Sequence, residues 1–309
     1  MRITEEEAVQ RLNAGEVVSL PTETVYGMAA SVHCPEAVQA IFTLKGRPAD
    51  NPLIIHLASF DQLAAFTDRF PPDLEALAEK FWPGAMTLVI PVDQEAVSSM
   101  IRAGLPTAAF RVPQRQKTRE VIAKTGPLVM PSANLSGKPS ATAAEHVEQD
   151  FGQDFPVMDG GFCEEGVEST ILLYYGDRWA IVRRGALAAE MFIPILGYQP
   201  EFLKQEDPKK PICPGQMYRH YAPQAILHLC RTIPDNAHTI LGYTGVRYPD
   251  NAHIYLLGTK QDPRSVAESL YRTLRRLDQE GVKEVWIDVD IPNEGLWKTI
   301  HDRLARAAS

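Results

Sequence analysis

The sequence predicts an α/β protein with two parts: an N-terminal α/β sandwich on a mixed, twisted sheet, and a smaller, open α/β domain of Rossmann-like outline. Short apolar runs that end at proline, such as residues 17–20 before Pro21, indicate strands, because proline cannot donate to a sheet. Runs with helical spacing lie between them, and Gly176 with Asp177 indicates a hairpin turn. From Ala225 onward, strands alternate with helices.

Length and proline content suggest how the chain is divided. Its 309 residues, 45 % of them hydrophobic, are enough for two separate cores. We expect a first domain at residues 1–200, a proline-punctuated linker at 201–223 and a second domain at 224–309. The second domain lacks the glycine fingerprint of a dinucleotide site.

Caps and apolar spacing predict the individual elements. Thr4 with Glu7 has the capping-box pattern before the first helix, and Thr142 with Glu145 repeats it before a later helix. Further helices are expected at 35–45, 74–82, after Pro263 and near the chain end, and strands at 17–20, 51–57, 87–91, 107–113, 128–130, 168–173, 178–185, 226–230, 239–243, 254–257 and 285–289.

Charge and composition exclude several classes of protein. The formal net charge of −8 and the pI near 5.5 disfavour strong, non-specific binding of nucleic acid. No run reaches the roughly 18 apolar residues of a membrane span, and residues 1–7 are acidic rather than signal-like. We therefore expect a cytoplasmic protein without a membrane partner. The cysteines are scattered and the histidines lack metal spacing, so we expect reduced thiols and no metal-ligand cluster.

Small polar residues follow two of the predicted strands at the point where each ends. Thr24 comes just after the first apolar run, and Ser132 and Asn134 come just after the run at 128–131. Ser140 lies in a hydroxyl-rich loop before a helix, where backbone N–H groups often bind phosphate, although an ordinary turn is the alternative. Binding residues often lie in loops that follow strand ends of this kind.

Two cations flank the end of the helix that begins at Pro35. Lys45 and Arg47 lie on either side of Gly46, which is typical of a helix C-terminus. One interpretation is that they complement the helix dipole on a solvated surface. The other is that they bind an anion. In both cases we expect them at an exposed helix end, outside the core stripe.

Three further residues have two interpretations each. Arg111 projects from a strand among apolar neighbours, which requires either an anionic ligand or a salt bridge at the rim. His56 is either a satisfied core histidine or a ligand contact. Alternation along residues 178–185 places Arg183 on the same face as Trp179 and Ile181.

The motifs together resemble a known family. Pro-Thr-Glu-Thr-Val-Tyr-Gly at 21–27, Lys-x-Arg at 45–47 and Ser-x-Asn at 132–134 resemble the YrdC-type domain of threonylcarbamoyl-AMP synthases. The resemblance covers residues 17–184, and the remainder is similar to the C-terminal domain of the longer, two-domain synthases. It implies the same sandwich and Rossmann-like folds.

The resemblance also implies a reaction and a site. L-Threonine, bicarbonate or CO₂, and ATP would give threonylcarbamoyl-AMP and pyrophosphate, with Mg²⁺ accompanying ATP and a downstream tRNA-modifying transferase receiving the product for threonylcarbamoyladenosine. Lys45 and Arg47 would be catalytic as cations on the phosphates. The other implied ATP contacts are Asn51, Thr107, Ser132, Asn134, Ser140, Arg183, Tyr218 and Tyr221. The implied threonine contacts are Thr24, His56, Arg111 and Ser169.

The segment at 213–223 is unusually rich in aromatic and basic residues for a spacer. We expect it to fold over the nucleotide site, with Tyr218 or Tyr221 reaching the ligands. The alternative is that these aromatic residues hold the two domains together.

Two other functions remain as alternatives. One is a module that binds double-stranded RNA or the ribosome without chemistry, which the negative net charge disfavours. The other is a carbamoyltransferase that uses carbamoyl phosphate. Release of pyrophosphate from ATP distinguishes the synthase from both.

Overall fold

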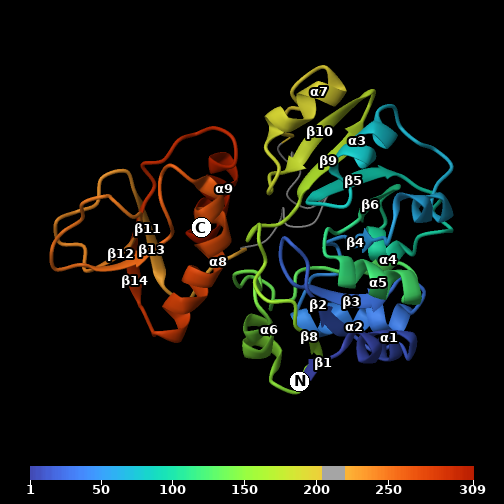
Figure 1. Cartoon of the computed structure of the whole chain (residues 1–309), viewed down its shortest axis with the longest axis horizontal. Coiled ribbons are helices and arrows are strands. Elements are labelled where there is room, and N and C mark those ends of the chain that lie inside the picture. Colours follow the sequence, from blue (N-terminus) through green and yellow to red (C-terminus); the bar gives the residue numbers. More distant parts are fainter. Residues whose placement is uncertain (204–219) are drawn as a thin grey trace.

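The computed structural model describes residues 1–203 and 220–309. Figure 1 shows a larger domain formed by the N-terminal part of the chain and a smaller domain formed by the C-terminal part. One hydrophobic cluster lies within the larger domain, and another fills the smaller domain and extends to Val25 and Val167 of the larger one. The predicted α/β class, with a mixed sheet followed by a Rossmann-like domain, is confirmed. In the described residues, no helix is both long enough and apolar enough to cross a bilayer.

The larger domain is built on one mixed sheet. Within the described residues its ten strands run in the order β1 (Arg2–Ile3), β8 (Val157–Met158), β2 (Val18–Leu20), β3 (Gly27–Ser31), β7 (Leu128–Val129), β4 (Ile54–His56), β6 (Thr107–Arg111), β5 (Met86–Pro91), β9 (Thr170–Tyr175) and β10 (Arg178–Arg183). Some neighbours are parallel, such as β4 and β6, and others are antiparallel, such as β5 and β6.

Helices cover both faces of this sheet. They are α1 (Glu5–Asn13), α2 (Pro35–Lys45), α3 (Leu74–Phe81), α4 (Ser99–Arg102), α5 (Gln116–Thr125), α6 (Ala144–Phe151) and α7 (Ile193–Leu196), with the 3-10 turns η1 (Phe60–Ala65) and η2 (Ala189–Phe192). The main core, which includes α2 and α3, lies on one face, and α1 and α5 pack on the other. A smaller apolar patch on the second face contains Ile54, Ala109 and Ile171.

The ends of the first helices follow the predicted signals. The side chain of Thr4 accepts from the backbone of Glu7, whose carboxylate accepts from the Thr4 N–H, so the capping box is present. The helix α2 ends at Gly46 in the left-handed conformation. The second predicted capping box is wrong: α6 is capped by Ala143, and the N–H of Thr142 instead donates to Nδ1 of His146.

The predicted hairpin is present, but its side-chain alternation is not regular. A register shift between Ile181 and Arg183 places Arg183 opposite Ile171. Arg183 therefore lies on the face that carries the apolar patch, whereas Trp179 and Ile181 point into the main core. The prediction that Arg183 shares a face with Trp179 and Ile181 is wrong, because the bulge adds one residue to the strand.

The smaller domain has a parallel sheet with two long helices. Within the described residues, its strand order is β11 (Ile226–Cys230), β14 (Glu284–Asp288), β12 (Thr239–Gly242) and β13 (His253–Leu256). The helices α8 (Pro263–Gln279) and α9 (Trp297–Ala307) lie between this sheet and the larger domain (Figure 1). Their apolar stripes pack on the sheet, while several polar residues of both helices reach the larger domain.

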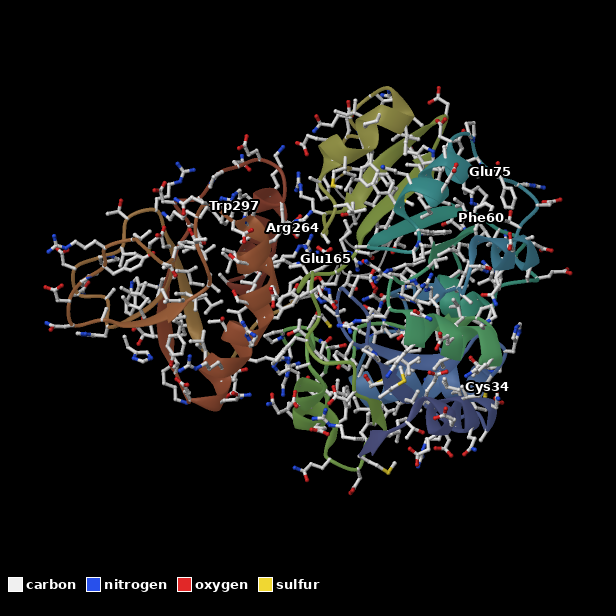
Figure 2. The ribbon with its side chains drawn as sticks, viewed as in Figure 1. Cys34, Phe60, Glu75, Glu165, Arg264 and Trp297 are labelled. Atoms are coloured by element: carbon white, nitrogen blue, oxygen red, sulfur yellow. The ribbon has the colours of Figure 1, made fainter. Side chains whose placement is uncertain are left out.

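The two domains meet along a tight seam. A Cβ atom on Gly166, which has φ +65°, would lie 2.3 Å from the carbonyl oxygen of Ala267 in α8. Arg275 of α8 donates to Asp150 at 2.8 Å, and both side chains are almost fully buried. Glu165 lies on this boundary near Arg264, at the start of α8 (Figure 2). The helices of the smaller domain are therefore in direct contact with the loops of the larger one.

The chain stays attached to the large sheet beyond residue 200. Phe202 forms a bridge with Ile181, and the N–H of Leu203 donates to the Ile181 carbonyl at 2.9 Å. Most of the predicted linker, including Tyr218, lies outside the described residues. The division at residues 200 and 223 stays a prediction.

A candidate active site beside the apolar patch of the large sheet

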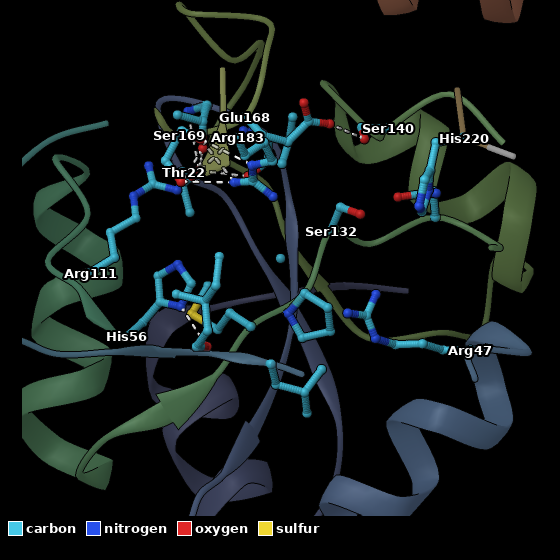
Figure 3. A pocket seen from close by; sticks show the side chains of 18 of the residues that line it. Thr22, Arg47, His56, Arg111, Ser132, Ser140, Glu168, Ser169, Arg183 and His220 are labelled. Carbon is cyan, nitrogen blue, oxygen red and sulfur yellow. Dashed lines mark hydrogen bonds between the residues drawn. The ribbon is translucent and has the colours of Figure 1, made fainter. Parts of the chain in front are cut away.

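A cavity opens on the second face of the large sheet, next to the apolar patch (Figure 3). The sequence-predicted site residues that line it are Thr24, Arg47, His56, Arg111, Ser132, Asn134, Ser140, Ser169, Arg183 and Tyr221. Segments that are far apart in the sequence therefore meet here.

One wall is formed by the turn that follows Pro21. The hydroxyl of Thr22 donates to the carbonyl of Val25 at 2.6 Å, and the backbone N–H of Thr24 donates to that hydroxyl at 3.2 Å. The hydroxyls of Thr22 and Thr24 lie 2.8 Å apart. Such local side-chain bonds fix a turn that has left the sheet.

Arg111 is buried in this wall. Its Nη2 donates to Glu23 Oε1 at 2.6 Å, its Nη1 to Thr24 Oγ1 at 2.8 Å and its Nε to the Gly84 carbonyl at 3.1 Å. The salt bridge that the sequence offered as an alternative is present, but deep in the fold rather than at a rim. Because a guanidinium has five N–H donors, these three bonds leave two for a ligand.

His56 presents one ring nitrogen to the cavity. Its Nδ1 lies 3.2 Å from the carbonyl oxygen of Ile54, which can only accept, so Nδ1 carries the proton and Nε2 is an acceptor. Burial, reinforced by the positive charge of Arg111, lowers the pKa of His56 to about 3. The imidazole is therefore neutral near pH 7.

Arg183 reaches the cavity from the bulged strand. Its Nη2 donates to the carbonyl and to the hydroxyl of Ser169, each at 3.0 Å. The Ser169 hydroxyl also lies 2.7 Å from that of Thr87. The bulge thus places the guanidinium of Arg183, an implied ATP contact, beside Ser169, which the family resemblance assigns to threonine.

Arg47 and Lys45 occupy different environments: the prediction of an exposed helix end is wrong for Lys45, which is buried, whereas Arg47 is half-buried. The guanidinium of Arg47 donates to the carbonyls of Asn51 and Pro52 at 3.3 and 2.8 Å and lines the cavity. Burial, together with Arg183, lowers the pKa of Arg47 to about 10, so it stays charged at pH 7. Lys45 is only 3 % exposed and does not line the cavity.

Lys45 instead holds the loop that forms the opposite wall. Its Nζ donates to the carbonyls of Ser132 and Asn134, both at 2.5 Å. Burial, then the charge of Arg47, lowers the pKa of Lys45 well below its usual value. In this structure the ammonium positions the Ser-x-Asn loop rather than facing the cavity.

The Ser-x-Asn loop offers an unused acceptor. Nδ2 of Asn134 donates to the carbonyls of Leu135 and Lys138, which fixes the amide orientation. Its Oδ1 is buried and has no partner among the described residues. Buried polar atoms are normally satisfied, so an orphan at a cavity wall is a candidate ligand contact.

Two carboxylates in the site were missed by the sequence analysis. Glu23 pairs with Arg111, and Glu168 lines the cavity and accepts from the hydroxyl of Ser140 at 2.6 Å. Each lies next to a predicted contact, Thr24 or Ser169, and that adjacency was the only signal. Their partners come from distant segments.

Besides Lys45, two predicted contacts in the described part of the chain do not line the cavity. Asn51 is buried beside Arg47, and its Oδ1 has no partner among the described residues. Thr107 lies at the start of β6, at the opposite end of that strand from Arg111. Tyr218 is outside the described part of the chain.

The described end of the linker reaches both the cavity and the smaller domain. His220 and Tyr221 line the cavity, and Nε2 of His220 is buried without a partner among the described residues. The Tyr221 ring stacks on Tyr271 of α8 with centroids 5.2 Å apart, and the Arg303 guanidinium lies 5.0 Å from it. Tyr221 therefore packs across the domain seam, as the alternative interpretation held, and also borders the cavity.

Comparisons with known proteins agree with this arrangement. Residues 10–185 match the Sua5/YciO/YrdC family, described as telomere recombination, and residues 187–309 match the C-terminal domain of threonylcarbamoyl-AMP synthase. Proteins from Bacillus subtilis and Pyrococcus abyssi, both named threonylcarbamoyl-AMP synthase, are 38 % and 36 % identical over 98 % and 96 % of this chain and 92 % of each relative.

A solved structure supports the same assignment. The crystal structure of P. abyssi Sua5 complexed with L-threonine superposes with a TM-score of 0.89 at 33 % identity, over 100 % of this chain and 96 % of that one. The resemblance predicted from the motifs is confirmed. The chain belongs to the Sua5/YciO/YrdC family, as a member that carries the C-terminal domain of threonylcarbamoyl-AMP synthases.

Proposed function

We propose that this protein is a threonylcarbamoyl-AMP synthase, a nucleotidyltransferase that makes threonylcarbamoyl-AMP and pyrophosphate from L-threonine, bicarbonate or CO₂, and ATP. The observation that carries the proposal is the pairing, in one cavity, of a neutral His56 and Arg111 with the cations Arg47 and Arg183. The printed names of the relatives and the threonine bound to the P. abyssi protein agree with it.

The wall with Thr24, His56 and Arg111 fits an amino acid. The two remaining N–H donors of Arg111 suit an α-carboxylate, since guanidinium and carboxylate form charge-assisted pairs. The unprotonated Nε2 of His56 suits a hydroxyl or an amine N–H. Glu23 fixes the orientation of Arg111 before the substrate arrives.

The cations at the other side suit the phosphates of ATP. The neutral amine of threonine adds to CO₂, loses a proton and becomes a carbamate. A carbamate oxygen then attacks the α-phosphorus in line, the bond to the bridging oxygen breaks, and pyrophosphate leaves with that electron pair. Arg47 and Arg183 would stabilise the negative charge that develops on the phosphate oxygens, and no enzyme nucleophile is required.

We expect Mg²⁺ to enter with ATP rather than in a protein cage. Among the described residues, no group of three or more His, Cys, Asp or Glu side chains is placed to hold a metal. Both oxygens of Glu168, the carboxylate at the cavity wall, already accept hydrogen bonds. Mg²⁺ often binds mainly through substrate phosphates and water, and there it neutralises phosphate charge.

The proposed product requires a partner that consumes it. A threonylcarbamoyl-adenylate is a mixed anhydride that hydrolyses easily, so a transferase that accepts the threonylcarbamoyl group should act next. The family resemblance implies that this transferase modifies tRNA. The cytoplasmic location stays a prediction.

The test is an assay of pyrophosphate with each substrate withheld in turn. We expect pyrophosphate when ATP, bicarbonate and threonine are all present, and a threonine-containing adenylate by mass spectrometry. Pyrophosphate formed without bicarbonate, or in equal amounts with any amino acid, would contradict the proposal. Salt-sensitive binding of double-stranded RNA without pyrophosphate would favour the binding-module alternative.

A further inference from the structure

Glu168 is held at the cavity wall by both domains. Ser140 of the larger domain donates to its Oε1 at 2.6 Å. From the smaller domain, Tyr271 of α8 donates to the carboxylate at 3.0 Å, and Nε of Arg303 in α9 donates to Oε2 at 2.9 Å. Among the described residues, the helices of the smaller domain thus supply two of the three side chains that donate hydrogen bonds to this carboxylate.

Arg303 has no contact with solvent. Its side chain is 0 % exposed, and its Nη2 donates to the backbone carbonyl of Arg184 at 2.6 Å. It therefore spans from α9 to the end of the bulged strand as well as to Glu168. Arg184 directly follows Arg183, the guanidinium that faces the cavity.

The charge of Glu168 depends on these neighbours. Burial alone favours the protonated carboxyl, but the positive charges of Arg303 and Arg183 outweigh burial and lower the pKa of Glu168 to about 2. Without Arg303, the pKa of Glu168 would rise, because burial raises it and, of these two cations, only Arg183 would remain to lower it. A neutral carboxyl accepts hydrogen bonds less strongly, so its bond to Ser140 would weaken.

We propose that Arg303 and Tyr271 are positioning residues for the reaction at this site, because they hold Glu168 as an ionised acceptor that orients Ser140 and sets the charge beside Arg183. The smaller domain then completes the active site without touching the substrates. This inference rests on the proposed function, since it concerns the residues that hold a side chain of the same cavity in place.

A pH experiment can isolate Glu168 because the tyrosine and histidine side chains around it, in the described part of the chain, do not titrate near neutrality. Burial raises the pKa of Tyr271 and of Tyr221 above their usual values. Burial and Arg47 lower the pKa of His220 to about 4. Arg183 stays charged. Asp302, which pairs with Arg303, keeps its bond to Arg306.

The first measurement is the rate of pyrophosphate release by Arg303→Met, divided by that of the wild type, from pH 6 to 8.5. Division removes the titration of the threonine amine, which both proteins share. We expect the ratio to fall toward pH 6, because loss of Arg303 raises the pKa of Glu168 and the ionised fraction of a carboxyl decreases as the pH falls toward and below its pKa. Arg303→Lys should restore a flatter ratio.

Two variants serve as controls. Lys298→Met removes a different cation of α9, whose partly exposed side chain lies 3.8 Å from Glu190 and does not line the cavity. Its ratio should stay flat. In the Glu168→Gln background, Arg303→Met should add no further pH dependence. A flat ratio for Arg303→Met itself, or an unchanged slope in the Gln background, would overturn the proposal.

A second measurement does not depend on activity. Thermal unfolding of Arg303→Met should differ from the wild type more at pH 8 than at pH 6, because a carboxyl whose folded pKa is raised destabilises the fold only when it must ionise. The difference should vanish in the Gln background, and its persistence would count against the proposal. If Arg303→Met does not fold, Tyr271→Phe carries both tests with the same expected signs. A wild type that releases no pyrophosphate would instead contradict the proposed function.

Discussion

Glu23 and Arg111 form an ion pair in the cavity wall that carries Thr24 and His56, with Oε1 and Nη2 2.6 Å apart and with only 3 % and 5 % of the two side chains exposed. The second carboxylate oxygen of Glu23 accepts from the backbone N–H of Gln114 at 2.9 Å. The pair joins the turn after β2 to the end of β6. It makes Arg111 part of the folded framework as well as of the site.

Removal of Glu23 should therefore lower both stability and activity. Glu23→Ala leaves Arg111 buried without its counter-charge, and breaking a buried pair in this way costs about 3–5 kcal/mol. Urea unfolding should show this loss, and KM for threonine should rise. Glu23→Gln, which keeps the shape and some hydrogen bonds, should lose less on both measures. Unchanged unfolding of Glu23→Ala would contradict a structural role for the pair.

The two cations of the Lys-x-Arg motif should behave differently. Arg47→Ala should cut turnover by the equivalent of roughly 2.7–4 kcal/mol, the usual cost of removing one transition-state donor. Its carbonyl partners, Asn51 and Pro52, neighbour each other in one loop, so we expect a smaller loss of stability. The assays are pyrophosphate release and urea unfolding of the same preparations.

Lys45→Met should lower the stability of the fold first, and activity only as a consequence. The carbonyls of Ser132 and Asn134 would lose a shared donor, and a buried acceptor left unsatisfied costs about 1–3 kcal/mol. We expect a lower melting temperature, with loss of activity following from a misplaced loop. An unaltered melting temperature together with lost turnover would return Lys45 to the direct catalytic role expected from its motif.

His56 should weaken the fold in acid. Because its pKa in the folded protein is about 3, against 6.5 unfolded, the unfolded chain binds more protons between these values. Stability is then fully present above pH 6.5 and is lost as the pH falls toward 3, with a slope of up to about 1.4 kcal/mol per unit. Unfolding of His56→Asn, followed from pH 7 to 4.5, should show a shallower decline. An equal slope would contradict a buried, neutral His56.

Threonine should be preferred to serine by a modest factor. A methyl group in a pocket contributes about 1–3 kcal/mol of discrimination, so kcat/KM should differ by about 10- to 200-fold. Competition between the two amino acids, read by mass spectrometry of the adenylates, measures the ratio directly. Equal use of serine would show that no surface of the cavity contacts the methyl group.

Sequence reasoning predicted the elements better than their details. Short apolar runs and caps identify α1, α2 and the alternating strands and helices of the smaller domain, because these signals are local. The bulge before Arg183 is set by pairing with Ile171, twelve residues earlier in the chain, and has no local signal. Alternation therefore predicted the wrong face.

The site shows the same limit. Thr24, His56 and Ser132 stand next to strand ends, so their position in the sequence predicts their position in the fold. The burial of Lys45 depends on carbonyls almost ninety residues away, and the ionisation of Glu168 depends on Arg303 in another domain. Such partners become visible only when the chain is folded.

Gly166 lies so close to α8 that the seam between the domains has no room for a methyl group at this position. An alanine there would act as a steric wedge, because its Cβ would overlap the backbone of Ala267 and Glu268 while its φ is already one that favours glycine. The wedge would push α8 outward and carry Tyr271 away from Glu168 without changing any charge. A substitution at Gly166 would therefore change the spacing of the two domains while leaving every charged and catalytic side chain of the site in place.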